Sequence, residues 1–89
     1  MKPVRLLGSF KKDMKRMIRR GHDSAKMETI VTRIRQSLEL TPSCKPHPLK
    51  GDWKGYWDCH VENDWILIYK ITDTEVLLAR TGTHADLFE

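Results

Sequence analysis

The chain has 89 residues, the size of one small domain with one compact core, so we treat residues 1–89 as a single domain. Hydrophobic residues make up 39% and charged residues 31%, and the longest apolar run, WILIY, is far shorter than the ~20 residues that cross a bilayer. No apolar stretch follows the charges at Lys2 and Arg5, so we expect no secretory signal and no membrane partner, a cytoplasmic location, and reduced thiols at Cys44 and Cys59.

The net charge of +4 is distributed unevenly along the chain. Residues 1–50 carry thirteen Lys and Arg against four Asp and Glu, whereas residues 51–89 carry three against eight. A basic half indicates a polyanionic partner, and nucleic acid is the commonest one for a protein with a pI of about 9.3. A solvated helical face explains the same charges, so charge alone leaves both interpretations open.

The N-terminal segment predicts a short strand followed by a helix. Residues Val4 to Leu7 have strand character, and Ser9 is a candidate N-cap for a helix over residues 10–20 that ends at Gly21. Helical spacing predicts that four apolar side chains face the core: Phe10, Met14, Met17 and Ile18. The opposite arc carries six cations: Lys11, Lys12, Lys15, Arg16, Arg19 and Arg20. Only Asp13 opposes them, so we expect this arc to bind RNA phosphates.

A second helix follows the turn GHDS, with Asp23 or Ser24 as its N-cap. Its apolar positions again keep the helical period: Met27, Ile30, Val31, Ile34 and Leu38. The short connection predicts a hairpin of two antiparallel helices. The next segment, ELTPSCKPHPLKG, contains three prolines and therefore predicts a stiff loop.

The second half of the chain predicts three strands, at residues 54–61, 64–71 and 75–82, which short connections join into an antiparallel meander. The central run WILIYKI is almost entirely apolar, so we expect an interior strand that is covered on both faces. Residues Ala85 to Phe88 suffice for one helical turn. The prediction is an α+β fold in which an N-terminal strand and a helical hairpin pack on a small antiparallel β-sheet.

Four histidines are candidates for proton transfer near neutral pH. His22 lies in the turn between the helices, where we expect an inert surface residue. His47, His60 and His84 lie at loop or strand-end positions beside strand-like runs. Taken singly, each of these three favours a hydrogen-bonded scaffold role, and spacing alone does not show whether they converge.

Two other kinds of site fit the sequence poorly. The set Cys44, His47, Cys59 and His60 lacks the close ligand pairs of structural zinc, and the adjacent Cys59 and His60 would point to opposite faces of a strand. Cys59 lies inside a strand between apolar neighbours, which is typical of a core cysteine and not of a nucleophile. We therefore expect no metal site.

Two segments, HPLKGDWKGYWDCHVENDWILIYK and ARTGTHADLF, resemble the YafQ branch of the RelE/ParE superfamily of bacterial toxins. The segment FKKDMKRMIRRG is similar to the basic first helix of that family and its glycine stop, so the resemblance covers nearly the whole chain. Most of its specificity lies in the pattern from His47 to Asp64 and in the later GTH and LF. The second helix and the TPSCKP loop match only in general character.

This resemblance implies a RelE-like fold and a ribosome-dependent endonuclease, without metal or cofactor, that cuts mRNA in the ribosomal aminoacyl site. The reaction is attack by the 2′-OH on the adjacent phosphate, which needs a base, an acid and stabilisation of charge. The positions that match catalytic residues are His47, His60, Asp64 and His84. The positions that match substrate contacts are Trp65, Arg80 and Phe88. In this reading the basic arc of the first helix contacts ribosomal RNA.

Strand alternation places His60 on one face with Asp58, and the following hairpin returns Asp64 to the same end of the sheet, so an imidazole and a carboxylate can be neighbours there. For Trp65, core packing is at least as well founded as base stacking. Phe88 lies on a terminal turn with little reason to be buried, and is the better stacking candidate.

The resemblance also implies partners: the ribosome with its 16S rRNA, the mRNA, and a cognate antitoxin that we expect to be acidic and partly disordered. The toxin–antitoxin complex would bind operator DNA through the antitoxin. Two other functions stay open, namely a gyrase-inhibiting toxin of the ParE type, which shares the fold, and a non-catalytic RNA-binding module. The three histidines and Asp64 favour the nuclease over both.

Overall fold

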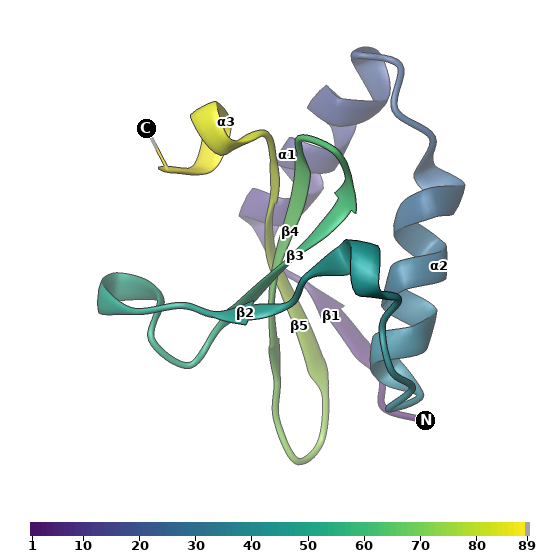
Figure 1. The fold of residues 1–89 in the computed structure, drawn as a ribbon, viewed down its shortest axis with the longest axis vertical. Coiled ribbons are helices and arrows are strands. Elements are labelled where there is room, and N and C mark those ends of the chain that lie inside the picture. The colour runs from purple at the N-terminus through teal and green to yellow at the C-terminus, as the bar shows by residue number, and fades with distance from the viewer. Residues whose placement is uncertain (89) are drawn as a thin grey trace.

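The computed structural model describes residues 1–88 and contains a five-stranded sheet with the strand order β1-β5-β4-β3-β2 (Figure 1). The elements are β1 (Val4–Leu6), α1 (Gly8–Arg19), α2 (Ser24–Arg35), the 3-10 helix η1 (Pro42–Cys44), β2 (His47–Pro48), the 3-10 helix η2 (Gly51–Trp53), β3 (Trp57–Glu62), β4 (Trp65–Ile71), β5 (Val76–Gly82) and α3 (His84–Phe88). No helix among residues 1–88 is long and apolar enough to span a membrane.

The sheet confirms the predicted α+β class and the antiparallel meander β3–β4–β5, but it is mixed. Strand β1 pairs in parallel with β5, with Arg5 opposite Leu77, across a long connection that contains both helices and the other three strands. Strand β2 lies within the segment predicted as a stiff loop, and its two residues, His47 and Pro48, pair with β3. The prolines limit this strand to two residues at the edge of the sheet.

Helix α1 differs from its prediction at the N-cap and in its buried face. Leu7 is the N-cap, and Ser9 lies inside the helix, where its Oγ donates a hydrogen bond to the carbonyl of Ala79, 2.7 Å away. Phe10 and Met17 are buried as predicted, Met14 is half-buried, and Ile18 is 51% exposed. The helix buries Asp13 instead, because this carboxylate has partners on β5 and the rotation that brings it to them moves Ile18 to the surface.

Helix α2 begins as expected, because the Asp23 carboxylate caps it by accepting a hydrogen bond from the Ala25 amide. Its buried side chains are Met27, Ile30 and Ile34. The prediction that Leu38 belongs to this stripe was wrong: the helix ends at Arg35, and Leu38 is 49% exposed.

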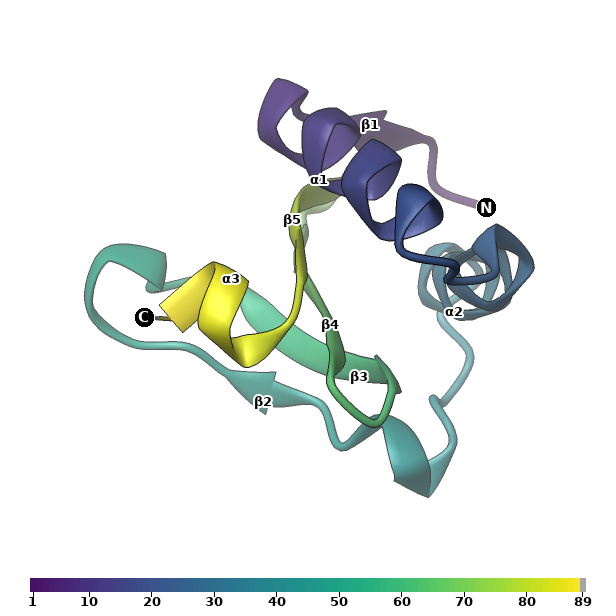
Figure 2. The same ribbon diagram turned by 90° about the horizontal axis from the view of Figure 1, so that it is seen from above.

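Strand β4 is the interior strand that its composition predicts. Trp65, Leu67 and Tyr69 join the main core beneath the two helices, whereas Ile66 and Ile68 alternate to the other face and are also fully buried. Helix α3 and the β2–η2 segment lie on the side of the sheet opposite α2 (Figure 2). Cover on both faces makes β4 a rigid support for side chains at its ends.

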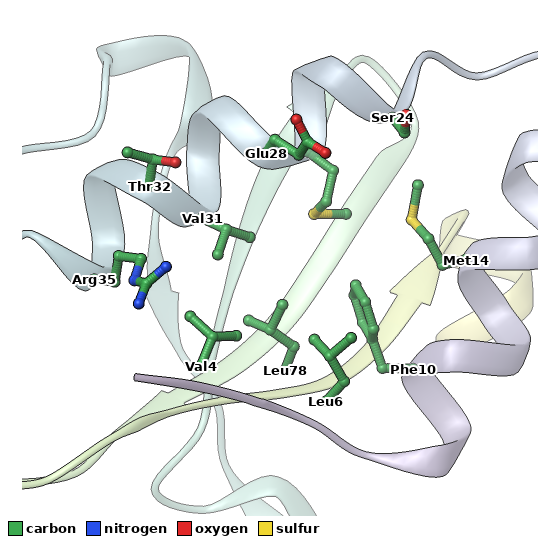
Figure 3. Close-up of a pocket in the computed structure, with 11 residues that line it drawn as sticks. Val4, Leu6, Phe10, Met14, Ser24, Glu28, Val31, Thr32, Arg35 and Leu78 are labelled. Atoms are coloured by element: carbon green, nitrogen blue, oxygen red, sulfur yellow. The ribbon is translucent and has the colours of Figure 1, made fainter. Parts of the chain in front are cut away.

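A groove of about 410 Å³ opens between α2 and the β1–α1 segment (Figure 3). Its lining is mostly apolar and includes Val4, Leu6, Phe10 and Val31. None of the predicted acid/base residues lines it. The candidate chemistry therefore lies elsewhere, at the end of the sheet where α3 begins.

Candidate active site

A carboxylate–imidazole pair joins the β3–β4 turn to the first residue of α3. The Nδ1 of His84 lies 2.8 Å from Oδ1 of Asp64, and the backbone amide of His84 donates to the same oxygen at 3.0 Å. These two hydrogen bonds, the backbone one first, hold the pKa of Asp64 below its ordinary value. The ionised carboxylate fixes Nδ1 as the protonated nitrogen, which leaves Nε2 for a substrate.

Sheet topology brings this pair together across twenty positions of sequence. Strands β4 and β5 are antiparallel neighbours, with Ile66 opposite Gly82, so the start of β4 lies beside the end of β5. Asp64 immediately precedes β4, and His84 follows Gly82 after a single residue. The β3–β4 turn and α3 accordingly lie at the same end of the sheet (Figure 1). The sequence predicted His60 as the imidazole beside Asp64, whereas the carboxylate binds His84 and His60 Nδ1 lies next to the Asn63 carbonyl.

Two further predicted residues lie beside the pair. The ring of His60, on β3, is centred 5.8 Å from the ring of His84, and its Nδ1 is 3.2 Å from the carbonyl of Asn63. The ring of Phe88, on α3, is centred 6.1 Å from His84 and is 44% exposed. Two imidazoles, a carboxylate and an exposed aromatic ring therefore share one surface, which we call the histidine cluster (His60, Asp64, His84 and Phe88).

His47 lies one strand further out, on β2. It is opposite Asp58 of β3, and its Nδ1 is 3.5 Å from Asp58 Oδ1. Because Asp58 and His60 are two residues apart on one strand, His47 shares a face of the sheet with His60. The Asp58 Oδ1 atom is buried and has no hydrogen-bond partner within residues 1–88, and the His47 imidazole is a polar group that approaches it.

Arg80 lies on β5, and its guanidinium is held by Asp13. Its Nε lies 2.6 Å from Asp13 Oδ2 and its Nη2 lies 3.3 Å from Oδ1. This contact raises the pKa of Arg80. The two contacts with Asp13 fix the orientation of the guanidinium. Because the side chain is 29% exposed, part of the guanidinium remains open to an anion.

Trp65 takes the packing alternative. It has no exposed surface, its Nε1 donates to Thr81 Oγ1 at 2.8 Å, and Thr81 Oγ1 in turn donates to the Ile66 carbonyl at 2.7 Å. An indole with no exposed surface cannot stack on a base in this conformation. His22, expected to be an inert surface residue, is half-buried and packs on Trp65 with ring centroids 4.8 Å apart.

The basic arc is opposed by more than Asp13. Arg20 forms a hydrogen-bonded ion pair with Asp86 of α3 at 2.7 Å, and Arg16 contacts both Asp13, at 3.1 Å, and Asp86, at 3.9 Å. The other four cations of the arc are exposed: Lys11, Lys12, Lys15 and Arg19. The predicted RNA surface therefore divides into two paired and four exposed cations.

Sequence reasoning did not assign roles to Asp58 and Asp86. Strand alternation was the signal for Asp58, since it places the residue on the face of His60. The signal for Asp86 is its spacing of three from Thr83, which is the pattern of a capping box at a helix start.

Both cysteines are free and buried; burial was predicted for Cys59 and not for Cys44. Burial, with the nearby Cys44 and Asp58, raises the pKa of the Cys59 thiol to about 12, so this residue is not a nucleophile at neutral pH. Within residues 1–88 the structure has no group of three or more His, Cys, Asp or Glu side chains placed to hold a metal ion.

The family model described as a bacterial toxin of the type II toxin–antitoxin system, YafQ, matches residues 2–89. The chain belongs to the YafQ family. The mRNA interferase toxin YafQ of Escherichia coli K12 is 50% identical over 82 residues, which cover 91% of this chain and 89% of that protein. The two proteins are thus aligned over nearly the whole length of each.

Solved structures agree with this assignment. The E. coli DinJ–YafQ toxin–antitoxin complex matches with a TM-score of 0.90 and 45% identity, covering 99% of this chain and 98% of that one. A metal-bound toxin from Helicobacter pylori matches with a TM-score of 0.93 and 32% identity, covering 99% of this chain and 100% of that one. The fold described above is therefore the fold of the YafQ-like toxins.

Proposed function

We propose that this protein is a ribosome-dependent mRNA endonuclease that inhibits translation. The observation that carries the proposal is the Asp64–His84 pair, with its 2.8 Å contact, beside His60 on an open surface. The E. coli relative that is 50% identical is named an mRNA interferase toxin, which supports RNA cleavage as the reaction. A translating ribosome in the cytoplasm would present the mRNA to the cluster.

The proposed reaction needs no external nucleophile. A base removes the proton of a ribose 2′-OH, the 2′-oxygen forms a bond to the adjacent phosphorus, and the bond from phosphorus to the 5′-oxygen breaks. An acid donates a proton to that oxygen, so the products are a 2′,3′-cyclic phosphate and a free 5′-OH. Positioned acids and bases of this kind contribute roughly 10²–10⁴-fold each.

Within this scheme the carboxylate of Asp64 orients His84 by holding its Nδ1 hydrogen, so that Nε2 faces the scissile phosphate. His84 and His60 supply the two proton-transfer groups, because their rings flank one space with centroids 5.8 Å apart. His47 lies on the same sheet face and, with Asp58 beside it, is a further cation for the phosphate when protonated.

Two other groups serve the substrate. The guanidinium of Arg80, fixed by Asp13, stabilises charge that develops on the phosphate oxygens. Phe88, 44% exposed beside His84, stacks on a base next to the cleaved bond. The exposed cations of α1 hold the backbone of ribosomal RNA through phosphate contacts.

We propose three partners besides mRNA. The ribosome, through its 16S rRNA, binds the basic surface. A cognate antitoxin neutralises the toxin, as indicated by the structure in which E. coli YafQ is bound to DinJ. The net charge of +4 favours an acidic antitoxin segment, and the complex binds operator DNA through the antitoxin.

The test is to map mRNA 5′ ends, and to identify the terminal groups, after translating ribosomes are incubated with the protein. We expect new ends within codons only when ribosomes are present, with a free hydroxyl on each new 5′ end and a cyclic phosphate on each new 3′ end. His84→Ala should lower the cleavage rate by roughly 10² or more, whereas Asp73→Ala, in the exposed β4–β5 turn, should not. Absence of cleavage by the folded wild type, with inhibition of gyrase instead, would reject the proposal in favour of a ParE-type toxin.

A further inference from the structure

One carboxylate ties the C-terminal helix to α1, 66 positions away in sequence. Asp86 Oδ2 lies 2.7 Å from Arg20 Nη1, and Asp86 Oδ1 lies 3.3 Å from Arg20 Nη2, so the two side chains meet fork to fork. Arg16 Nη2 approaches the same carboxylate at 3.9 Å. The Asp86 side chain is 16% exposed and the Arg20 side chain 42%, so the carboxylate is mostly covered whereas its cation lies at the surface.

The same carboxylate also caps α3. Asp86 Oδ2 accepts a hydrogen bond from the Thr83 amide at 3.0 Å, and Thr83 Oγ1 accepts one from the Asp86 amide at 3.1 Å, which is a reciprocal capping box. The carboxylate packs so closely on the chain that a Cβ at Gly82 would lie 2.9 Å from Asp86 Oδ2. Asp86 therefore fixes the junction between β5 and α3 through its hydrogen bonds with Thr83 and its close contact with Gly82.

Two carboxylates, Asp86 and Asp64, make the hydrogen bonds that hold the start of α3 in place. The helix has five residues, of which none is buried, and a helix of this length is not stable without tertiary contacts. Yet α3 carries His84 as its first residue and Phe88 as its last. The Asp64 contact holds one end of His84, and Asp86 holds the helix from which that side chain projects.

We propose that Asp86, paired with Arg20 and Arg16, is a positioning device that sets the orientation of His84 for RNA cleavage. The inference rests on the proposed function of the histidine cluster. It divides the basic arc by role: Arg16 and Arg20 hold the catalytic helix, whereas Lys11, Lys12, Lys15 and Arg19 remain for RNA. The alternative is that Arg20 is one more phosphate contact.

The two roles predict different kinetics. Loss of a phosphate contact weakens ribosome binding and lowers its salt dependence, whereas loss of a positioning contact lowers the cleavage rate at saturating ribosomes. A misplacement of about 1 Å costs up to roughly 10²-fold in rate. We therefore expect Arg20→Met and Asp86→Asn each to lower the saturated single-turnover rate by roughly 10-fold or more.

Three matched variants sharpen the test. Arg20→Lys keeps a cation for Asp86 and should recover much of the rate. Arg19→Met removes the same charge from the exposed neighbouring position, and should lower the salt slope of ribosome binding more than Arg20→Met does. Arg5→Met breaks an ion pair with Glu75, far from α3 in the fold, and should leave the saturated rate unchanged.

A readout without activity completes the experiment. The Leu87 amide donates to the Thr83 carbonyl at 3.1 Å, so its hydrogen exchange reports whether α3 is formed. In Arg20→Met and Asp86→Asn we expect faster exchange at Leu87, with the Leu67 amide of the buried strand β4 unchanged. This measurement stands even if the wild type cleaves no RNA, an outcome that would reject the proposed function and not the tie between α1 and α3. Unchanged exchange at Leu87, or loss of activity only through weaker ribosome binding, would overturn the inference.

Discussion

Replacing Asp13 by alanine is expected to destabilise the whole domain. The carboxylate is 4% exposed, and its two oxygens accept hydrogen bonds from Arg80 Nε at 2.6 Å, Arg80 Nη2 at 3.3 Å, Arg16 Nη2 at 3.1 Å and the Thr81 amide at 3.2 Å. Asp13→Ala leaves the buried Thr81 amide unpaired and the half-buried Arg80 without its counter-ion. A lost partner in a buried pair costs about 3–5 kcal/mol.

The lower end of that range applies, because the side chains of Arg80 and Arg16 are 29% and 36% exposed and water can partly solvate them. A loss of about 3 kcal/mol leaves a domain of ordinary stability folded. For a domain of this size, each kcal/mol lowers the Tm by roughly 4–8 °C, so the expected fall is about 12–24 °C.

Thermal unfolding followed by circular dichroism measures this fall, and Asp73→Ala is the control for losing an exposed aspartate. In a double-mutant cycle, Arg80→Met should recover at least about 1 kcal/mol in the Asp13→Ala background, since it removes the charge left unpaired. If Asp13→Ala lowers the Tm by less than about 4 °C, or shows no coupling with Arg80→Met, the view that this pair is buried and mutually dependent is refuted.

Three further predictions concern separate parts of the molecule. Asp64→Asn breaks a pair whose side chains are 61% and 57% exposed, so the free energy of unfolding in urea should change by less than about 1 kcal/mol while cleavage falls roughly 10²-fold; a large loss of stability would contradict this. Burial raises the pKa of Cys59 to about 12, so its contribution to stability is complete below the unfolded-state pKa of about 8.5 and is lost as pH rises towards 12, at up to about 1.4 kcal/mol per pH unit. Urea unfolding from pH 8 to pH 10.5 should therefore show a shallower pH dependence in Cys59→Ala, and equal slopes would argue against a buried thiol. Changing Lys12 and Lys15 to Gln should lower the slope of log K against log salt for ribosome binding by about one per residue; an unchanged slope would remove them from the RNA surface.

Local patterns in the sequence determined the kinds of element and much of the core. The run WILIYKI has no charged residue before Lys70, so exposing either face of this strand would leave apolar side chains in water. Strand β4 is indeed covered on both faces. Asp23 caps α2 because its carboxylate needs only the amide two residues ahead. The meander of three adjacent antiparallel strands was predictable from their short connections, but the sequence placed Asp64 beside His60, and only the structure shows that its carboxylate binds His84.

Long-range partners decided the rest. Helical spacing allows the buried face of α1 to include either Asp13 or Ile18 beside Met17. The Asp13 carboxylate accepts hydrogen bonds from three donors on β5, so the helix buries Asp13 and exposes Ile18. Trp65 became a core residue because Thr81 accepts its indole hydrogen.

The basic arc shows the same limit. Its charges are evident in the sequence, but the partner of Arg20 lies 66 residues away in α3, and only the packed sheet brings the two within 2.7 Å. A local pattern describes which surfaces a segment can bury. Which of those surfaces is buried depends on the few buried polar groups whose partners are distant in sequence. Leaving such a group unpaired costs more free energy than exposing one apolar side chain.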